Sequence, residues 1–259
     1  MKVDLHNHTV LCNHATGSVN EYVESAITCG TEFFGFSDHA PMHYDPAYRM
    51  RFEDMSVYEG WVQEAKETYK EKITVLLGYE VDFLPGYMDD RVLNRSCDYL
   101  IGSVHFIDDW GFDNPEFIGR YEGADINAIY ERYFKLIEEM AQSRKFDIVG
   151  HLDLLKVFKF LPTKDIRLLA KNALQAIKKG DMSIEINMSG YRKPIAEAYP
   201  SAMLLEEIAE LQIPITFGSD AHRPDQIGLF GDDVQALARS VGYSECALYQ
   251  GRKREMVKF

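Results

Sequence analysis

Nine side chains able to bind metal ions fall at or near the ends of segments that we predict to be strands. They are His6, His8, His14, His39, Glu80, His105, His151, Asp220 and His222. Clustered imidazoles repel one another once protonated and are costly to desolvate, whereas divalent metal ions turn the same cluster into a stable coordination shell. The residue types therefore predict a metal site assembled from distant parts of the chain.

The tightest spacing among the nine is the HxH pair of the first predicted strand. In an extended strand, His6 and His8 point to the same side and can bind one ion together. Such a pair arises easily by chance, and a single histidine is more often a satisfied core or surface group. The coincidence of all nine positions, rather than the pair, favours metal binding.

Mixed imidazole and carboxylate ligands suit Zn, Mn or Fe better than Mg or Ca, which prefer oxygen ligands. Metal ions held close together would lower the pKa of a shared water, so that hydroxide forms near neutral pH and attacks a metal-bound phosphorus. The cations would also neutralise the charge on the phosphoryl oxygens. This chemistry hydrolyses a small phosphorylated substrate to an alcohol and inorganic phosphate.

The elements that position these residues alternate between strand and helix. Seven segments rich in β-branched and aromatic residues are predicted as strands, at 2–6, 33–39, 73–83, 99–106, 147–153, 183–187 and 214–220. This alternation predicts parallel strands joined by crossover helices, which close into an α/β barrel, a (β/α)7 relative of the TIM barrel. The carboxyl ends of the strands open on one face, where the nine side chains should meet.

The connections carry further signals. The spacing of Ser18 with Glu21, and of Ser56 with Glu59, predicts capping boxes at the starts of two helices.

No repeat, linker or low-complexity tract interrupts the chain, so we expect one domain over residues 1–259.

Six motifs resemble the polymerase and histidinol phosphatase (PHP) superfamily. They are DLHNHT (4–9), SDHAP (37–41), GYEVDF (78–83), IGSVHF (101–106), VGHLD (149–153) and FGSDAH (217–222). The resemblance spans nearly the whole chain and implies a distorted seven-stranded barrel holding three divalent metal ions. In addition, WGFDNPE at 110–116 resembles the histidinol-phosphatase branch, which implies L-histidinol phosphate as substrate and a place in histidine biosynthesis.

Carried over position by position, the resemblance implies three sets of ligands. Glu80 would bridge the first and third sets, and catalysis would depend on it. The sets are His6, His8, Glu80 and Asp220 for the first ion; His14, His39 and His222 for the second; and Glu80, His105 and His151 for the third. The chain departs from the commoner pattern at His14, where some members of the superfamily have a carboxylate.

Substrate-binding residues are sought on the same face. Arg192, just past the sixth predicted strand, is our candidate for binding phosphate, because a guanidinium matches the geometry of that anion. A solvated loop arginine is the alternative. Lys156 and Lys159, after the fifth strand, are second choices because surface lysines are usually only solvated.

Histidinol carries an amine and an imidazole, so its pocket should offer acids and flat apolar walls. The long connection 107–124 contains both kinds of residue. Asp113 and Glu116 could provide the acids, and Trp110 and Phe112 the walls, with core or lid packing as the alternative for the two aromatic side chains.

Four other residues lie next to the predicted ligands. Asp38, Asp82 and Asp153 could orient histidine rings through the second ring nitrogen, with surface caps as the alternative. Cys12 is a candidate thiolate ligand only in isolation, because the set of imidazoles is complete without it.

The charge of the chain limits its partners. With 41 acidic and 28 basic residues, the formal net charge is −13. This charge repels nucleic acid, although bound cations would still attract a small anion.

The start MKVDLHNHTV lacks the apolar run of a signal peptide, no stretch is apolar enough for a membrane span, and the four cysteines are widely spaced. We expect a cytoplasmic protein with reduced thiols that binds neither nucleic acid nor membrane.

Two alternative functions fit the same residues. A phosphoesterase of the same superfamily could act instead on a nucleotide, an oligonucleotide or phosphotyrosine. A catalytically silent metal-binding barrel could serve as a partner subunit, although degeneration usually removes metal ligands first.

Overall fold

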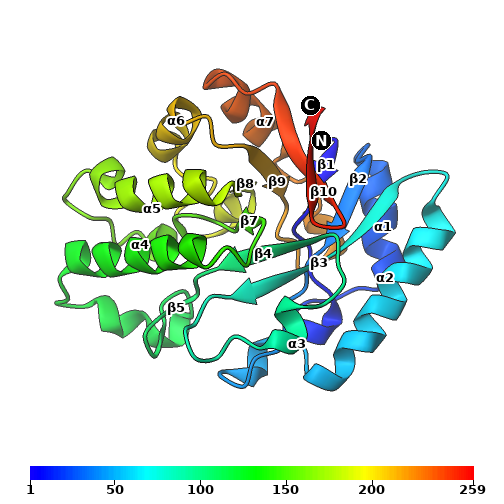
Figure 1. The fold of residues 1–259 in the computed structure, drawn as a ribbon, viewed down its shortest axis with the longest axis horizontal. Helices are drawn as coiled ribbons and strands as arrows, with labels where there is room; N and C mark the ends of the chain where they lie inside the picture. The colour runs from blue at the N-terminus through cyan, green and yellow to red at the C-terminus, as the bar shows by residue number, and fades with distance from the viewer.

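Seven parallel strands form the centre of the computed structural model, which describes all 259 residues. Neighbouring strands in the sheet follow one another along the chain, and helices connect them (Figure 1). The strands are β1 (Val3–Asp4), β2 (Phe33–Phe36), β3 (Thr74–Asp82), β4 (Tyr99–Ser103), β7 (Ile148–Val149), β8 (Ser183–Asn187) and β9 (Ile215–Gly218).

The first and last strands of this sheet meet and close it. The Leu5 amide donates to the Phe217 carbonyl oxygen over 2.9 Å, and the His8 amide donates to the Ala221 carbonyl oxygen over 3.0 Å. The barrel is distorted because β1 and β7 each have only two residues. The prediction of a distorted seven-stranded barrel is confirmed.

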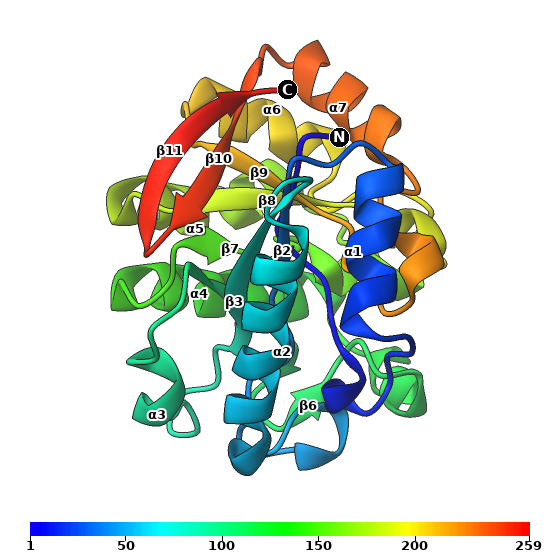
Figure 2. The same ribbon diagram turned by 90° about the vertical axis from the view of Figure 1, so that its right-hand side faces the viewer.

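Helices surround the barrel on its outside (Figures 1 and 2). They are α1 (Val19–Thr28), α2 (Met55–Tyr69), α3 (Asp90–Leu93), α4 (Ile126–Ser143), α5 (Ile166–Gly180), α6 (Ala202–Glu210) and α7 (Gly231–Ser240). None of them combines the length and the apolar character that crossing a bilayer requires.

One of the two predicted capping boxes is present. At α1, the Glu21 amide donates to the Ser18 hydroxyl, and the Ser18 amide donates to the Glu21 carboxylate over 2.6 Å. The box predicted from Ser56 and Glu59 is wrong. A 3-10 turn (Phe52–Asp54) runs directly into α2, so Ser56 lies inside the helix instead of at its start.

Several strands are shorter than predicted. The segment 147–153 contributes only Ile148–Val149, because the chain turns away at His151, where φ is +21°. The segment 214–220 ends as a strand at Gly218, and Asp220 has φ +49°. In 99–106, β4 ends at Ser103 and a separate hairpin follows, β5 (Phe106–Ile107) with β6 (Trp110–Gly111).

A C-terminal hairpin that the sequence did not reveal covers the amino end of the barrel. Its strands are β10 (Glu245–Gln250) and β11 (Lys253–Lys258), visible beside the barrel in Figure 2. The Tyr249 hydroxyl lies 2.7 Å from the Ser183 hydroxyl at the start of β8, and the Thr216 hydroxyl donates to the Ala247 carbonyl over 2.9 Å. The barrel is therefore open only at its carboxyl end.

Tyr99 packs against the inner strands through two glycines. Its hydroxyl donates to the Leu5 carbonyl oxygen over 2.7 Å, and the side chain is fully buried. A Cβ at Gly35 would lie 2.0 Å from this hydroxyl oxygen, and one at Gly78 would lie 2.4 Å from the ring. The two glycines leave the space that the tyrosine fills.

Two glycine-to-alanine substitutions should have opposite effects on stability. Gly35→Ala is expected to lower the free energy of unfolding by about 1–3 kcal/mol, because the new methyl group overlaps Tyr99. Gly60→Ala, on the exposed face of α2 with nothing within 4 Å, should raise it by about 0.5–1 kcal/mol. Urea unfolding of both variants measures the difference, and an unchanged midpoint for Gly35→Ala would contradict the packing.

Candidate metal centre

All nine predicted side chains lie at or just beyond the carboxyl ends of the strands, in the part of the barrel left open by the hairpin. His6 and His8 follow β1, His39 follows β2, and Glu80 lies near the end of β3. The others follow β4 (His105), β7 (His151), β9 (Asp220 and His222) and the 3-10 turn Val10–Cys12 (His14). Residues up to 216 positions apart in sequence are thus neighbours.

The first group contains His6, His8, Glu80 and Asp220. The ligand atoms of His6, His8 and Glu80 all lie within 4.8 Å of one another. His6 Nε2 is 3.4 Å from Glu80 Oε2, and His8 Nε2 is 3.1 Å from Asp220 Oδ1. Both histidine side chains are fully buried, so this group forms the floor of the centre.

The second group brings together His14, His39 and His222. Their ligand nitrogens also lie within 4.8 Å of one another. The ring of His14 is stacked 4.6 Å from the ring of His222, and its Nδ1 is 2.8 Å from the Cys12 carbonyl oxygen. A hydrogen bond from Nδ1 leaves Nε2 of His14 free to bind an ion.

The third group is formed by His105 and His151 with the other oxygen of Glu80. His151 Nε2 lies 2.9 Å from Glu80 Oε1, and His105 Nε2 lies 3.7 Å from it. Glu80 Oε2 is also 2.7 Å from Nδ1 of His39. A single buried carboxylate therefore contacts members of all three groups.

The bonding of buried atoms fits a metal centre. His6 Nε2, Glu80 Oε2 and His222 Nε2 are buried and make no hydrogen bond, since the contact of Glu80 Oε2 with His39 does not have the geometry of one. Leaving a buried polar atom unsatisfied costs about 1–3 kcal/mol. Imidazole nitrogens and carboxylate oxygens that converge in this way are the donor set of divalent metal ions, which would satisfy the three atoms together.

Carboxylates raise the pKa of three of the histidines. Burial alone would lower the pKa of His6, but Glu185, Glu80 and Asp220 outweigh it and raise that pKa well above its ordinary value. In the same way the pKa of His8 is raised to about 9 against its burial, through Asp220 and Asp38.

Against the same effect of burial, the pKa of His105 rises to about 10 through Asp82 and Glu80. The raised pKa values of His6, His8 and His105 therefore favour the protonated form of these three rings near neutral pH.

The second group behaves in the opposite way. Burial lowers the pKa of His39 to about 4. Burial and the neighbouring His8 also lower the pKa values of His14 and His222. These three rings are neutral at pH 7, which is the form that binds a metal ion.

Two of the three aspartates proposed to orient rings do so. Asp38 Oδ1 lies 3.4 Å from His8 Nδ1, and Asp82 Oδ1 lies 2.7 Å from His105 Nδ1. Asp82 also accepts a hydrogen bond from the buried Arg49 over 2.6 Å. The prediction for Asp153 is wrong, because its carboxylate accepts from the Ser201 amide and pairs with Lys156 instead of a histidine.

Two residues on β8 that contact proposed metal ligands were not predicted from the sequence. Glu185 Oε1 lies 2.7 Å from His6 Nδ1, and Asn187 Nδ2 donates to Asp220 Oδ2 over 3.2 Å. In SIEIN, polar residues at 183, 185 and 187 alternate with isoleucines, and all five residues are buried. A charged residue on the inward face of a strand is the sequence signal that could have identified Glu185.

A cavity of 760 Å³ opens onto the centre. Seven of the nine side chains reach it, all except His6 and His8, which lie beneath. Its outer walls combine aromatic, acidic and basic residues, namely Tyr44, Phe106, Phe117, Asp45, Asp109, Asp113 and Arg49. A small molecule bound here would contact the metal ligands at one end and these walls at the other.

Arg192 lies in this cavity, as its sequence position predicts. Its Nη2 donates to the carbonyl oxygens of Ser219 and Asp220 over 2.8 and 2.9 Å, while Nη1 is buried without a partner. Lys156 is instead buried between Asp153 and Glu197, and Lys159 is exposed outside the cavity. Of the three cations, only Arg192 can meet a ligand beside the metal groups.

Of the four residues proposed to recognise histidinol, only one lines the cavity. Trp110 and Phe112 are not cavity walls but core residues, with ring centroids 4.5 Å from Tyr121 and 5.4 Å from Tyr133, respectively. Asp113 does line the cavity, whereas Glu116 does not. The aromatic walls come from Tyr44, Phe106 and Phe117 in their place.

Cys12 lies closer to the centre than its sequence position suggested. Its sulfur is within 4.8 Å of ligand nitrogens of His8 and His222. The thiol donates to the Thr9 carbonyl oxygen over 3.1 Å, and burial raises its pKa far above the ordinary value. The thiol form is therefore favoured over the thiolate that binds metals.

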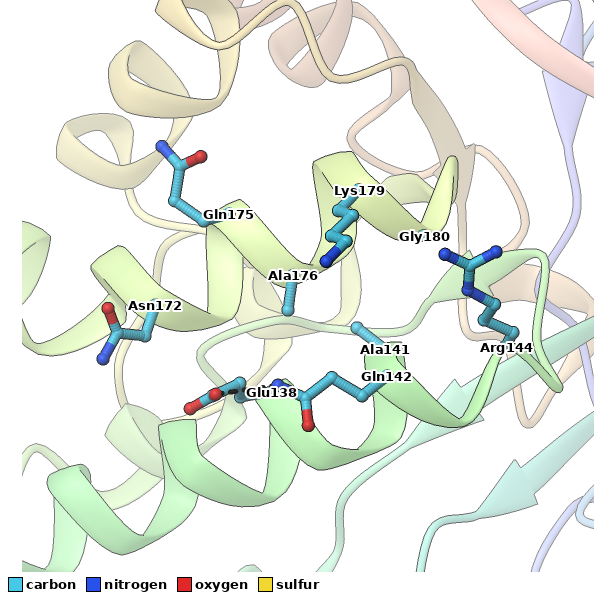
Figure 3. A pocket seen from close by; sticks show the side chains of 9 residues that line it. All are labelled: Glu138, Ala141, Gln142, Arg144, Asn172, Gln175, Ala176, Lys179 and Gly180. Atoms are coloured by element: carbon cyan, nitrogen blue, oxygen red, sulfur yellow. Dashed lines mark hydrogen bonds between the residues drawn. The ribbon is translucent and has the colours of Figure 1, made fainter.

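A second hollow, of 400 Å³, lies between α4 and α5 (Figure 3). The side chains drawn there include Glu138, Gln142, Asn172 and Lys179, and none of the groups able to bind a metal ion is among them. The groups able to bind a metal ion therefore lie at the carboxyl end of the barrel and not in this hollow.

A solved structure shares this fold. Histidinol phosphate phosphatase from Lactococcus lactis, in complex with zinc, L-histidinol and phosphate, is 21% identical to this chain and superposes with a TM-score of 0.80. The likeness covers 98% of each chain.

Sequence comparison finds relatives of higher identity than this solved structure. A protein of Deinococcus radiodurans named probable histidinol-phosphatase is 41% identical over 245 residues, covering 92% of this chain and 93% of that protein. The histidinol-phosphatase of Bacillus subtilis is 29% identical, covering 88% of this chain and 96% of that protein. The PHP domain family matches residues 4–189. This match, with the motifs and the geometry that those residues adopt, shows that the chain belongs to the PHP family.

Proposed function

We propose that this chain is a metal-dependent phosphatase that hydrolyses L-histidinol phosphate to L-histidinol and inorganic phosphate. The observation that carries the proposal is the convergence of three ligand groups on Glu80 at the base of a single cavity. The names of the D. radiodurans and B. subtilis relatives support this substrate.

One continuous core of 69 buried residues supports the further proposal that residues 1–259 act as one domain.

The proposed metal content is three divalent transition-metal ions, Zn, Mn or Fe. The three groups of ligand atoms described above would each hold one ion, with Glu80 shared by two of them and Asp220 completing the first. The zinc in the L. lactis structure supports a transition metal. When bound, the ions would supply a water of lowered pKa as nucleophile and neutralise the phosphate oxygens.

The protein's own groups position the substrate. Arg192 Nη1 has no partner within the protein and is directed to donate to a phosphate oxygen, while Nη2 is fixed by two carbonyl oxygens. Phe106 and Phe117 offer flat surfaces for an imidazole ring. Asp113 forms no ion pair in the protein and can bind the amine of histidinol. The acids around the opening also disfavour a polyanion such as nucleic acid.

Proton exchange accompanies metal binding at this centre. In protein stripped of metal, the raised pKa values keep His6, His8 and His105 protonated at pH 7. A metal ion binds only the deprotonated ring, so each of these histidines must release its proton. Metal binding should therefore be favoured as the pH rises.

Assays against three substrates test the proposed reaction. The metal-loaded protein should release phosphate from L-histidinol phosphate with a kcat/KM at least about tenfold above that for an aryl phosphate, which lacks the amine and imidazole. Cleavage of a short oligonucleotide should be undetectable. An oligonucleotide or phosphotyrosine as the best substrate would contradict the proposal.

Glu80→Gln should abolish phosphate release, because a neutral amide replaces the charged carboxylate that the first and third groups share. The far-ultraviolet circular dichroism should remain that of the wild type. An unchanged rate in this variant would favour a role for the barrel other than catalysis.

Arg192→Ala should lower kcat/KM for L-histidinol phosphate about 10- to 100-fold, because a charged hydrogen bond to phosphate contributes about 1.5–3 kcal/mol. Arg192→Lys should recover part of the loss, since it restores charge without the fork. Steady-state kinetics measures both variants. Arg223→Ala is the control, since this arginine is exposed, pairs with Asp225 and does not line the cavity; an equal loss there would contradict a specific role for Arg192.

Calorimetric titration of the stripped protein with Zn²⁺ should show net proton release at pH 7. The apparent affinity should increase between pH 7 and about 10, and level off once the pKa values of about 9 for His8 and about 10 for His105 are passed. Titrations in two buffers of different ionisation enthalpy give the number of protons. Affinity that is independent of pH over this range would be inconsistent with these protonation states. Chelation should also lower the melting temperature, by linkage.

A further inference from the structure

The inward face of β8 supplies none of the nine proposed ligands, yet it contacts three of them. Glu185 and Asn187 point to the barrel interior, and Ile184 and Ile186 to the outside layer, as the alternation of a strand requires. Glu185 is 1% exposed and does not line the cavity, so it cannot touch substrate. A buried carboxylate in this place calls for a role inside the protein.

Both oxygens of Glu185 are used. Oε1 is 2.7 Å from Nδ1 of His6, and Oε2 accepts from the backbone amide of His151 over 2.9 Å. An ionised carboxylate only accepts hydrogen bonds, so Nδ1 of His6 must carry the hydrogen. In the neutral ring, which is the form that binds a metal ion, Nε2 of His6 then keeps its lone pair on the side of Glu80, where it has no hydrogen-bond partner.

The contact with His151 acts on the backbone. His151 has φ +21°, which is costly for a residue with a side chain, and its amide hydrogen bond to Glu185 holds the turn. This turn directs Nε2 of His151 to Glu80. Glu185 therefore reaches a ligand of the third group as well as one of the first.

Asn187 extends the contacts to Asp220. Its Nδ2 donates to Glu185 Oε2 over 3.0 Å and to Asp220 Oδ2 over 3.2 Å. Its Oδ1 accepts from the Ser189 amide over 2.8 Å, which fixes the orientation of the side-chain amide. The space for this network exists because position 218 is glycine, where a Cβ would lie 1.9 Å from Glu185 Oε1.

We propose that Glu185 is a positioning residue that sets the affinity of two metal positions at once, by fixing the tautomer of His6 and the backbone of His151. Asn187 assists it through Asp220. This inference rests on the proposed metal centre. It predicts that the position built from His14, His39 and His222, which Glu185 does not contact, is independent of it.

Glutamine cannot replace this carboxylate. The donors of His6 and His151 approach opposite oxygens, and Asn187 adds a second donor to one of them. In either orientation, the amide NH₂ of Glu185→Gln would face a donor. The loss of such an outer hydrogen bond typically weakens metal binding about 10- to 100-fold.

The test is competition between metal-stripped protein and a chromogenic chelator for Zn²⁺. Glu59→Gln is the matched control, because Glu59 is also a carboxylate bonded by two partners, Tyr79 and Arg95, but on α2 away from the centre. Wild type and Glu59→Gln should bind more than one ion with the same affinities. Glu185→Gln should keep one wild-type affinity and lose about 10- to 100-fold in the others.

A second readout separates positioning from general stability. In zinc-loaded protein labelled with ¹⁵N-histidine, long-range ¹H–¹⁵N spectra should show His6 bearing its hydrogen on Nδ1, and this signal should change in Glu185→Gln but not in Glu59→Gln. If Glu185→Gln fails to fold, Asn187→Ala decides, with an expected loss of several-fold in affinity at the first position.

Two outcomes overturn the inference in distinguishable ways. A wild-type protein that binds one ion or none refutes the metal centre itself, and the role of Glu185 with it. A wild-type protein that binds several ions while Glu185→Gln and Asn187→Ala bind the same number with the same affinities leaves the centre intact and refutes the positioning role.

Discussion

The structure depends on how the buried charge of Glu80 is compensated. Its carboxylate is 1% exposed and lies between the imidazoles of five histidines, three near Oε2 and two near Oε1. A buried charge is tolerated only when opposite charge and hydrogen bonds surround it. Protons on the rings can supply the positive charge, and so can divalent cations. The parallel strands bring the imidazoles to one end of the barrel, which makes this exchange possible.

A second layer of carboxylates lies behind the rings. Asp38, Asp82 and Glu185 contact the outer nitrogens of His8, His105 and His6, respectively. Each of these acids fixes which nitrogen faces the centre, so the ring geometry is prepared before any ion binds. Arg49 balances one of them through its 2.6 Å contact with Asp82. Because Arg49 belongs to the long connection after β2, that loop is joined through Asp82 to the proposed ligand His105.

Much of this arrangement could be predicted from sequence, because ligand type and strand rhythm are local properties. The seven strands and the meeting of the nine side chains at one end of the barrel follow from them, whereas the division into three ligand sets came from the resemblance to the PHP superfamily. The predictions that were wrong concern features that the local sequence does not determine. The strands before His151 and Asp220 end early, because both residues have positive φ. Asp153 accepts a hydrogen bond from Ser201 instead of contacting a histidine, and Trp110 packs against Tyr121. Glu185 was not predicted because its partners lie after β1 and β7, far away in the sequence. The C-terminal hairpin was not predicted because β10 is a short continuous apolar run and β11 is largely polar, so neither shows the alternation typical of a strand.

The hairpin of β10 and β11 has a kinetic consequence. It covers the amino end of the barrel, and Tyr99 occupies the interior beneath the histidines, so a molecule in the cavity has one way out. Under the proposed function, phosphate would lie deepest, beside Arg192, and the alcohol nearer the solvent. The alcohol must then depart first and phosphate last. An enzyme with this order of release is inhibited by inorganic phosphate in competition with its substrate, so its turnover would be sensitive to the phosphate level around it.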